Sequence, residues 1–230
     1  MQKELIVISL GGSIVAQDEI NVKFLKRFKS LIVKEIKNGR RFIIVIGGGK
    51  TCRKYQSAAG QVTKLTDEDL DWLGIHATRL NAHLLRTIFR DYAKKEINKD
   101  PTKVENFKED ILIAAGWKPG FSTDFDAVML AKMYGAKKII NMTNIDYVYD
   151  IDPRKSELAK PLPNLNWKEY RKLVGEKWNP GSNAPFDPIA SKKAEGFGLE
   201  VVILNGADLK NFNSCLNNKK FKGTVVSRSK

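Results

Sequence analysis

The sequence contains little cysteine and little histidine. Its 230 residues include two cysteines, Cys52 and Cys215, and two histidines. Two distant cysteines form neither a disulfide framework nor a Cys-x-x-Cys pair, which fits a reducing compartment. His76 and His83 have no third ligand beside them, so we expect exposed or interface positions rather than a metal site.

Long hydrophobic runs are also missing. No apolar stretch approaches the roughly 20 residues that a membrane-spanning helix needs. The start, MQKELIVISLGGS, passes from a short polar tip directly into a strand-like run, without the long apolar region and cleavage site of a signal peptide. We therefore expect a cytoplasmic protein without a membrane partner.

Acidic residues are few relative to basic ones. The 40 Lys and Arg and 26 Asp and Glu give a net charge of +14, which raises the possibility of nucleic-acid binding. The lysines are, however, spread along the whole chain, and no DNA- or RNA-binding motif accompanies them. We interpret the charge as a solvated surface that attracts anionic substrates, and expect no nucleic-acid partner. Binding to a long duplex with a steep salt dependence would contradict this interpretation.

A Walker P-loop is absent, although IIVIGGGKTCRKY (residues 43–55) contains GKT. The P-loop pattern requires a glycine five residues before Gly49, and that position is Ile44, inside the apolar run. What remains is a strand that ends in glycines and opens a helix, an arrangement that presents backbone N–H groups to an anion. Taken alone, the triple glycine favours a tight turn that needs positive φ.

Strand-like and helix-like segments alternate along the chain. Near-continuous apolar runs predict strands at 4–10, 41–46, 110–115, 137–143, 199–206 and 223–227. Apolar spacing and capping residues predict helices at 21–38, from 51, at 66–95, 122–135 and 166–175, from 187, and at 208–217. A break near Gly74, a short helix within 98–108, and loops at 144–167 and 176–188 are also expected. This alternation predicts an α/β fold with a mostly parallel sheet covered on both faces.

Polar, glycine-bearing loops follow four of these strands. They comprise residues 11–13, 47–53, 116–124 and 143–153. Because ligands bind beyond the carboxyl ends of parallel strands, two glycine loops at one edge indicate a polyanion or two phosphate groups. Four such loops at one edge are hard to explain by structural needs alone.

Six segments together resemble the amino acid kinase superfamily, and within it the archaeal-type uridylate kinases. They are SLGGS, IVIGGGKTCRKY, DWLGIHATRLNAHLL, KPGFSTD, TNIDYVYDIDPRK and DPIASKK, in order between residues 4 and 227. The resemblance implies a three-layer αβα sandwich and a single domain over residues 1–230. It also implies that residues 1–135 bind the monophosphate acceptor and residues 136–230 bind ATP.

The same resemblance implies direct transfer of the γ-phosphoryl group of ATP to UMP, giving UDP and ADP. Mg²⁺ would arrive with ATP, with no metal ligand assigned to the protein, and a homohexamer is the expected assembly. Phosphoryl transfer depends on positioning and charge neutralisation rather than on covalent chemistry. Asp124 is therefore expected to orient groups and not to act as a base, because a UMP phosphate oxygen is already ionised.

Individual site residues follow from the resemblance as well. The catalytic set is Asp124, Lys192, Arg53 and Lys50. The UMP-binding set is Gly48, Asp71, Lys118, Pro119, Gly120, Phe121, Ser122, Thr123 and Asp124, with Asp71 bound to the ribose hydroxyls. The ATP-binding set is Gly12, Ser13, Gly49, Arg53, Thr143, Asn144, Tyr149 and Asp152.

Three positions depart from the family pattern. Ser9 stands where bacterial uridylate kinases carry a lysine, and Lys50 is our candidate for the missing charge. Tyr147 stands where the family favours glycine, so a strained positive φ and a reshaped ATP-side loop are expected. Asp126 stands where a small or apolar residue is usual, and we expect it at the surface. Arg79, which matches the family, is expected to face either a neighbouring subunit or the site.

The sequence leaves alternative functions open. Isopentenyl phosphate kinases carry a histidine before the triple glycine, where this chain has Ile46, and acetylglutamate and aspartate kinases differ in the middle segments. Molybdenum storage proteins share the fold and the ATP-side motifs but lack catalysis on a nucleoside monophosphate. Asp71 and the segment PGFSTD favour the kinase.

Overall fold

A seven-stranded, mostly parallel sheet forms the centre of the computed structural model, which describes residues 3–153, 155–175 and 184–228. The strands are, in spatial order, β3 (Ile111–Ala114), β2 (Arg40–Ile46), β1 (Glu4–Leu10), β4 (Lys138–Thr143), β8 (Glu200–Asn205), β9 (Thr224–Ser227) and β7 (Asn164–Asn166). The strands from β3 to β8 pair in parallel, whereas β9 runs antiparallel to β8. The parallel strands therefore end at one common edge.

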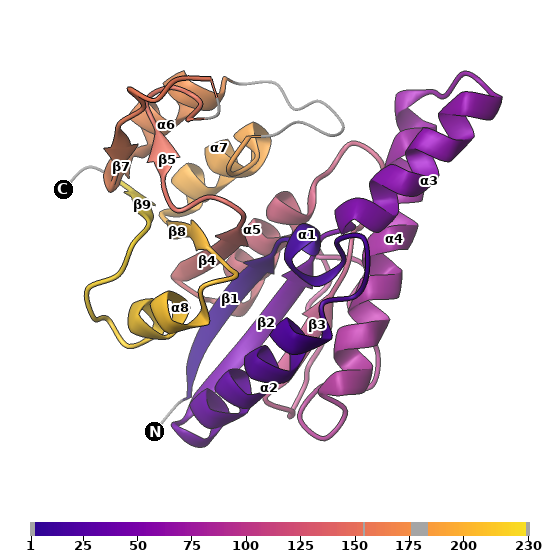
Figure 1. Ribbon diagram of the computed structural model, residues 1–230. Coiled ribbons are helices and arrows are strands. Elements are labelled where there is room, and N and C mark those ends of the chain that lie inside the picture. Colours follow the sequence, from indigo (N-terminus) through magenta and orange to yellow (C-terminus); the bar gives the residue numbers. More distant parts are fainter. Residues whose placement is uncertain (1–2, 154, 176–183, 229–230) are drawn as a thin grey trace.

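Helices cover both faces of this sheet (Figure 1). One face carries α2 (Val22–Lys37), α4 (Asp67–Ile88) and α8 (Leu209–Leu216). The other carries α5 (Thr123–Tyr134), α6 (Trp167–Val174) and α7 (Pro188–Phe197). The predicted three-layer αβα architecture is thus confirmed.

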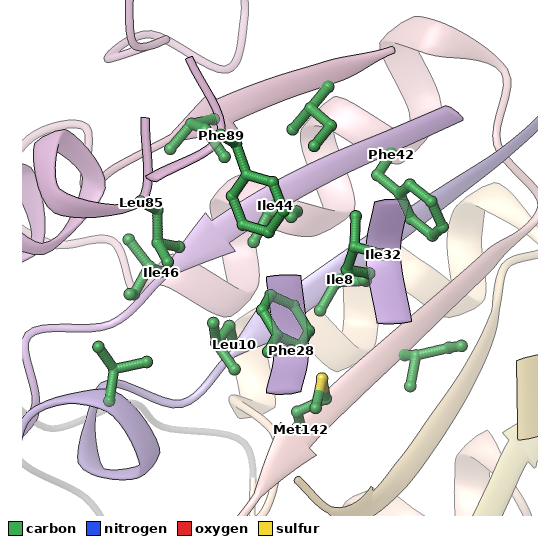
Figure 2. Packing of buried hydrophobic residues seen from close by; sticks show 14 of the residues in the cluster. Ile8, Leu10, Phe28, Ile32, Phe42, Ile44, Ile46, Leu85, Phe89 and Met142 are labelled. Carbon is green, nitrogen blue, oxygen red and sulfur yellow. The ribbon is translucent and has the colours of Figure 1, made fainter. Parts of the chain in front are cut away.

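Alternation along the buried strands divides the core into two apolar clusters. In β1, Ile8 and Leu10 face α2 while Val7 packs on the opposite side, as the period of two in a strand requires. Figure 2 shows Phe28 and Ile32 of α2 lying over the side chains of β1. Because both faces are covered, the strands are near-continuous apolar runs.

Helix α4 is one unbroken helix, contrary to the expected break at Gly74. It opens with a capping box in which Thr66 and Asp69 satisfy each other's backbone N–H groups. A Cβ placed on Gly74 would lie 3.5 Å from the sulfur of Cys52 in α3 (Gly49–Val62). This is an ordinary contact distance, so Gly74 lies where α3 and α4 pack together and does not end α4.

Helix α3 and the start of α4 extend beyond the sheet (Figure 1). None of the residues of α3 is buried, and Tyr55 and Val62 are 64% and 87% exposed. Only the first turn of α3 comes near the sheet edge. Beyond it, one side of the helix packs on α4, where Gln56 donates to the carbonyl oxygen of Leu70, and the other side faces solvent.

The sequence missed several small elements. α1 (Gly12–Val15) follows β1 directly, and β5 (Val148–Tyr149) pairs with β6 (Pro161–Leu162) inside the predicted loop 144–167. The short helix expected within 98–108 does not form. Most of the loop predicted at 176–188 lies outside the described residues. No helix among the described residues is long and apolar enough to cross a membrane.

Candidate active site

A cleft of about 690 Å³ opens at the carboxyl ends of β1, β2, β3 and β4. The segment that follows each of the four strands contributes to its lining, represented by Ser13, Gly48, Ser122 and Asn144. Helix α4 adds Asp71 to the same lining. The four polar loops expected at one edge of the sheet therefore meet around one cavity.

Gly12, Gly47 and Gly49 form a glycine junction beside this cleft. A Cβ added to Gly12 would lie 2.3 Å from both the carbonyl oxygen of Gly47 and the nitrogen of Gly49. Gly49 has a φ of +65°, a conformation that disfavours any side chain. Buried Asn81 donates to the carbonyl oxygen of Gly47 at 2.9 Å. The loops after β1 and β2 are therefore one unit joined backbone to backbone.

Substitution of Gly12 tests this close packing. We expect Gly12→Ala to destabilise the fold by about 2 kcal/mol or more, because backbone atoms must move to admit the methyl group. Gly60→Ala on exposed α3 is the matched control: the new Cβ would meet only a Leu65 methyl at 3.8 Å. That change should stabilise the protein by about 0.5–1 kcal/mol. Denaturant unfolding of both variants measures the difference, and equal midpoints would contradict the packing argument.

Two carboxylates, Asp124 and Asp187, lie together beside the cleft. Asp124 is the second residue of α5 and accepts a hydrogen bond from the Ser9 hydroxyl at 2.8 Å. Its other oxygen accepts from the backbone N–H of Asp187 at 3.1 Å. Asp187 caps α7 by accepting from the N–H of Ala190, and the Ser122 hydroxyl also hydrogen-bonds to its carboxylate. The ends of β1, α5 and α7 are thereby joined.

Burial dominates the electrostatics of this pair. It raises the pKa of Asp124 to about 7, and the neighbouring charge of Asp187 adds to the rise. The hydrogen bonds from Ser9 and from the Asp187 N–H oppose it. Burial likewise raises the pKa of Asp187. Carboxyl groups whose pKa values are raised by burial beside a cleft are typical of functional sites.

The opposite wall of the cleft combines a cation and an acid from the α3–α4 pair. Arg53 lies on α3 and is the one cationic side chain among the described residues that line the cavity. Asp71 on α4 accepts a hydrogen bond from the N–H of Gly120 at 2.7 Å. The cleft therefore offers backbone N–H groups, a guanidinium and carboxylates to a phosphorylated ligand.

Comparison with known proteins agrees with this arrangement. Residues 4–205 match the model of the amino acid kinase family. The chain belongs to the amino acid kinase family. It is 36% identical to a uridylate kinase from Methanospirillum hungatei, over 97% of this chain and 95% of that protein. It is 32% identical to a uridylate kinase from Methanocorpusculum labreanum, over 97% and 96%.

A solved member of the amino acid kinase family has the same architecture. The crystal structure of uridylate kinase from Archaeoglobus fulgidus superimposes with a TM-score of 0.81 at 28% identity, over 96% of this chain and 99% of that chain. The likeness thus extends over the whole chain.

Most of the residues expected to bind ligands lie around the cleft. Ser13, Gly48, Gly49, Arg53, Asp71, Phe121, Ser122, Thr123, Thr143 and Asn144 line it. Gly12 packs beneath Gly49, and Asp124 lies behind Ser122 through the network described above. Gly120 contacts Asp71, and Lys118 lies over the Trp117 ring at 4.1 Å.

Other expected residues lie apart from the cleft as the described residues form it. Pro119 belongs to the segment that ends at Phe121 but does not line the cavity. Tyr149 lies in the β5–β6 ribbon, where its ring packs edge-on against Tyr147 at 6.4 Å, and Asp152 follows that strand. Asn218 is the one non-glycine residue with positive φ among the described residues, so the strain expected at Tyr147 is not present.

The two lysines of the predicted catalytic set, Lys50 and Lys192, also lie away from the cleft. The Lys50 ammonium pairs with Asp18 at 2.9 Å. Lys192 lies on the outer face of α7, in a groove with Arg171, Glu195 and Arg228. The structure therefore does not bring either ammonium group to the cavity.

Two further expectations concern the segment behind the cleft. Asp126, expected at the surface, is 1% exposed, so that expectation is wrong. Arg79 donates to the carbonyl oxygen of Trp117 at 3.1 Å and thus supports the wall of the cleft. Exposed His76 lies beside Trp72, and His83 is exposed as expected.

Sequence reasoning missed Asp187 and Asn81 as parts of this site. Asp187 precedes a proline that begins a helix, a capping pattern that could have identified the carboxylate. Asn81 carried no such signal, since its role depends on the packing of α4 against the glycine junction.

Proposed function

We propose that this chain is a uridylate kinase that transfers the γ-phosphoryl group of ATP to UMP, giving UDP and ADP. The observation that supports this best is the single cleft lined by Gly49 of the glycine junction, Arg53 and Asp71, with the Asp124–Asp187 pair directly behind Ser122. The similarity of the chain to uridylate kinases over nearly its whole length supports the same reaction class.

The acceptor and the donor would occupy opposite ends of the cleft. In the half formed by residues 1–135, Asp71 accepts hydrogen bonds from the UMP ribose, and Arg53, Ser122 and Thr123 hold its phosphate. In the half formed by residues 136–230, Thr143 and Asn144 border ATP, whose phosphates extend toward Ser13 and the amino end of α3. The central sheet runs through both halves, which supports a single domain.

Positioning and charge neutralisation account for the chemistry. The transferred group passes through a transition state with negative charge on its outer oxygens, and N–H donors and cations that are already in place stabilise it. The glycine junction and the uncapped amino end of α3 supply such donors. Arg53 supplies positive charge, and Asp124 orients the groups around the reacting phosphates.

Magnesium would enter with ATP. Among the described residues no group of three or more His, Cys, Asp or Glu side chains could hold a metal ion. Mg²⁺ prefers oxygen ligands, retains water and is usually held by substrate phosphates with one or two carboxylates, so the phosphate oxygens of ATP would be its main ligands. When bound, the ion neutralises charge on the phosphates.

Of the two predicted catalytic lysines, this proposal gives a role to Lys50 only. Lys50 could neutralise phosphate charge after release from its exposed pair with Asp18, since such pairs contribute little stability. Lys192 is not assigned a phosphate contact, because it projects from the outer face of α7.

The pH dependence of activity tests the role of Asp124. Because its pKa is about 7 in the free protein, and the proposed role needs the ionised form, kcat/KM should rise with pH through an acidic limb near 7. Asp187→Asn should move that limb to lower pH, since the charge of Asp187 raises the pKa of Asp124, while asparagine still caps α7. A limb that stays at the same pH in this variant would contradict the assignment.

A coupled assay for ADP release tests the function itself. ATP and Mg²⁺ are supplied with UMP, CMP, dUMP, AMP or GMP in turn, and we expect turnover with UMP. If protein that still binds ATP is silent with every monophosphate, uridylate kinase is rejected. That outcome would favour another acceptor or a non-catalytic storage protein.

We also infer a homo-oligomer, and a hexamer in particular. Trp72 and Leu80 are exposed apolar residues on α4, and Tyr55 and Val62 extend the apolar surface onto α3. Exposed side chains of this kind are typical of surfaces between subunits. Light scattering of the purified protein measures the mass that decides between monomer and hexamer.

A further inference from the structure

Asp126 is a buried acid with half of its carboxyl group unsatisfied. It lies on α5, two residues beyond Asp124, and is 1% exposed. One oxygen accepts a hydrogen bond from the N–H of Trp117 at 3.3 Å. The other has no hydrogen-bond partner among the described residues. Buried polar atoms without partners are rare and costly, so a carboxyl group at this position calls for a reason.

Both backbone polar groups of Trp117 are hydrogen-bonded to side chains. Asp126 on α5 accepts its N–H, and Arg79 on α4 donates to its carbonyl oxygen at 3.1 Å. Trp117 is the second residue of the segment 116–121, which forms a wall of the cleft through Gly116 and Phe121. Asp126, which lies outside the cleft, thus hydrogen-bonds to the segment that borders the cleft.

Further contacts tie this segment to α4. The N–H of Gly116 donates to the Thr78 hydroxyl at 2.8 Å, and the N–H of Gly120 donates to Asp71 at 2.7 Å. Asp126 supplies the hydrogen bond that ties the segment to α5, the helix that also carries Asp124. Loss of that bond would leave the segment attached by hydrogen bonds to α4 alone, among those described.

We propose that Asp126 is a positioning residue that fixes segment 116–121, and through it the Asp71–Gly120 contact, for binding of the nucleoside monophosphate. This inference rests on the proposed function, because it assigns the segment to the acceptor side of that site.

The protonation state fits a hydrogen-bond acceptor that carries no charge. Burial raises the pKa of Asp126 well above its usual value, and the acidic groups Asp124 and Asp100 add to the rise. A neutral acid keeps a carbonyl oxygen for the Trp117 N–H and adds no second negative charge behind Asp124. An asparagine has the same shape and the same acceptor.

Two substitutions separate positioning from packing. Asp126→Val removes the acceptor and fills the space with an apolar side chain, so it should raise KM for UMP about threefold to tenfold, with kcat and KM for ATP unchanged. Asp126→Asn keeps the acceptor and should keep KM for UMP at the wild-type value. A residue that served only to fill the core would give no such rescue and no selective effect on UMP.

Hydrogen exchange gives a readout that does not need turnover. In free Asp126→Val protein, peptides covering residues 116–121 should exchange faster than in wild type, and Asp126→Asn should restore the slow exchange. If the valine variant does not fold, Asp126→Ala replaces it, because alanine introduces no new contact. Wild-type exchange and wild-type KM for UMP in the folded valine or alanine variant would overturn the proposal.

The two readouts separate failure of this inference from failure of the function. If the wild-type protein has no UMP-dependent turnover, the proposed function is rejected and, with it, the assignment of the segment to UMP. If turnover is normal and only the Asp126 variants behave as wild type in both readouts, the function stands and the positioning role is rejected.

Discussion

Asp124→Asn is expected to lower kcat for UDP formation by about 10²- to 10³-fold, the size seen when one positioned electrostatic group is removed from an active site. The amide has nearly the same shape, so it can still accept the hydrogen bond from Ser9. What it loses is the negative charge that orients the groups around the phosphates, together with the second oxygen, which accepts from the Asp187 N–H. Steady-state kinetics at pH 8, where wild-type Asp124 is ionised, measures this effect.

The same variant should be more stable than wild type at pH 8. The folded-state pKa of Asp124, about 7, exceeds its unfolded value, so the folded protein binds more protons between these values. Stability therefore falls as pH rises toward 7. Removing the ionisable group abolishes this loss, which is of the order of a few kcal/mol, although the Asp187 N–H that loses its acceptor costs about 1–3 kcal/mol of it. The net advantage should vanish below about pH 4.

Ser9→Ala separates the charge of Asp124 from its orientation. This substitution removes one hydrogen bond and leaves the carboxylate in place, so its effect on kcat should be much smaller. A value of kcat in Asp124→Asn equal to that of wild type would show that the carboxylate has no part in the reaction.

Arg53→Ala should lower kcat/KM for UMP by about 10²-fold or more, because no other cation among the described residues lines the cleft. Lys54→Ala is the matched control, since it removes a neighbouring charge on the same helix whose ammonium group lies near exposed Asp18. That variant should keep the kinetics of the wild type. Similar losses in both variants would point to general electrostatic attraction instead of a phosphate contact, and raising the salt concentration would then weaken both.

The sheet and the edge that carries the site could be predicted from the sequence for a physical reason. Strands buried on both faces need apolar residues at most positions, so β1, β2 and β4 were visible as near-continuous apolar runs. After β2 a helix starts within a few residues, and the glycines at 47–49 marked that turn. The sequence therefore located the loops that meet at the cleft.

The direction of individual side chains was harder to predict. Lys192 lies five residues after Asp187, which rotates it by about 140° around α7, so a lysine near the motif faces away from the carboxylate. Asp126 is rotated by about 160° from Asp124 and correctly does not join the cleft. The expected surface position failed because the Asp126 carboxyl group lies against the backbone of Trp117, whose N–H it accepts, and is shielded from solvent there.

The two ends of helix α3 differ in how tightly they are packed. Its first residue is fixed by backbone contact with the loop after β1, and its last turns touch no core. Within the single chain, a substitution at the first residue must be compatible with the positions of two loops, whereas one at Val62 in the last turn, which is 87% exposed, meets mainly solvent. This helix should therefore show a gradient of mutational tolerance, with drift permitted at its far end and almost none at the end that faces the phosphates.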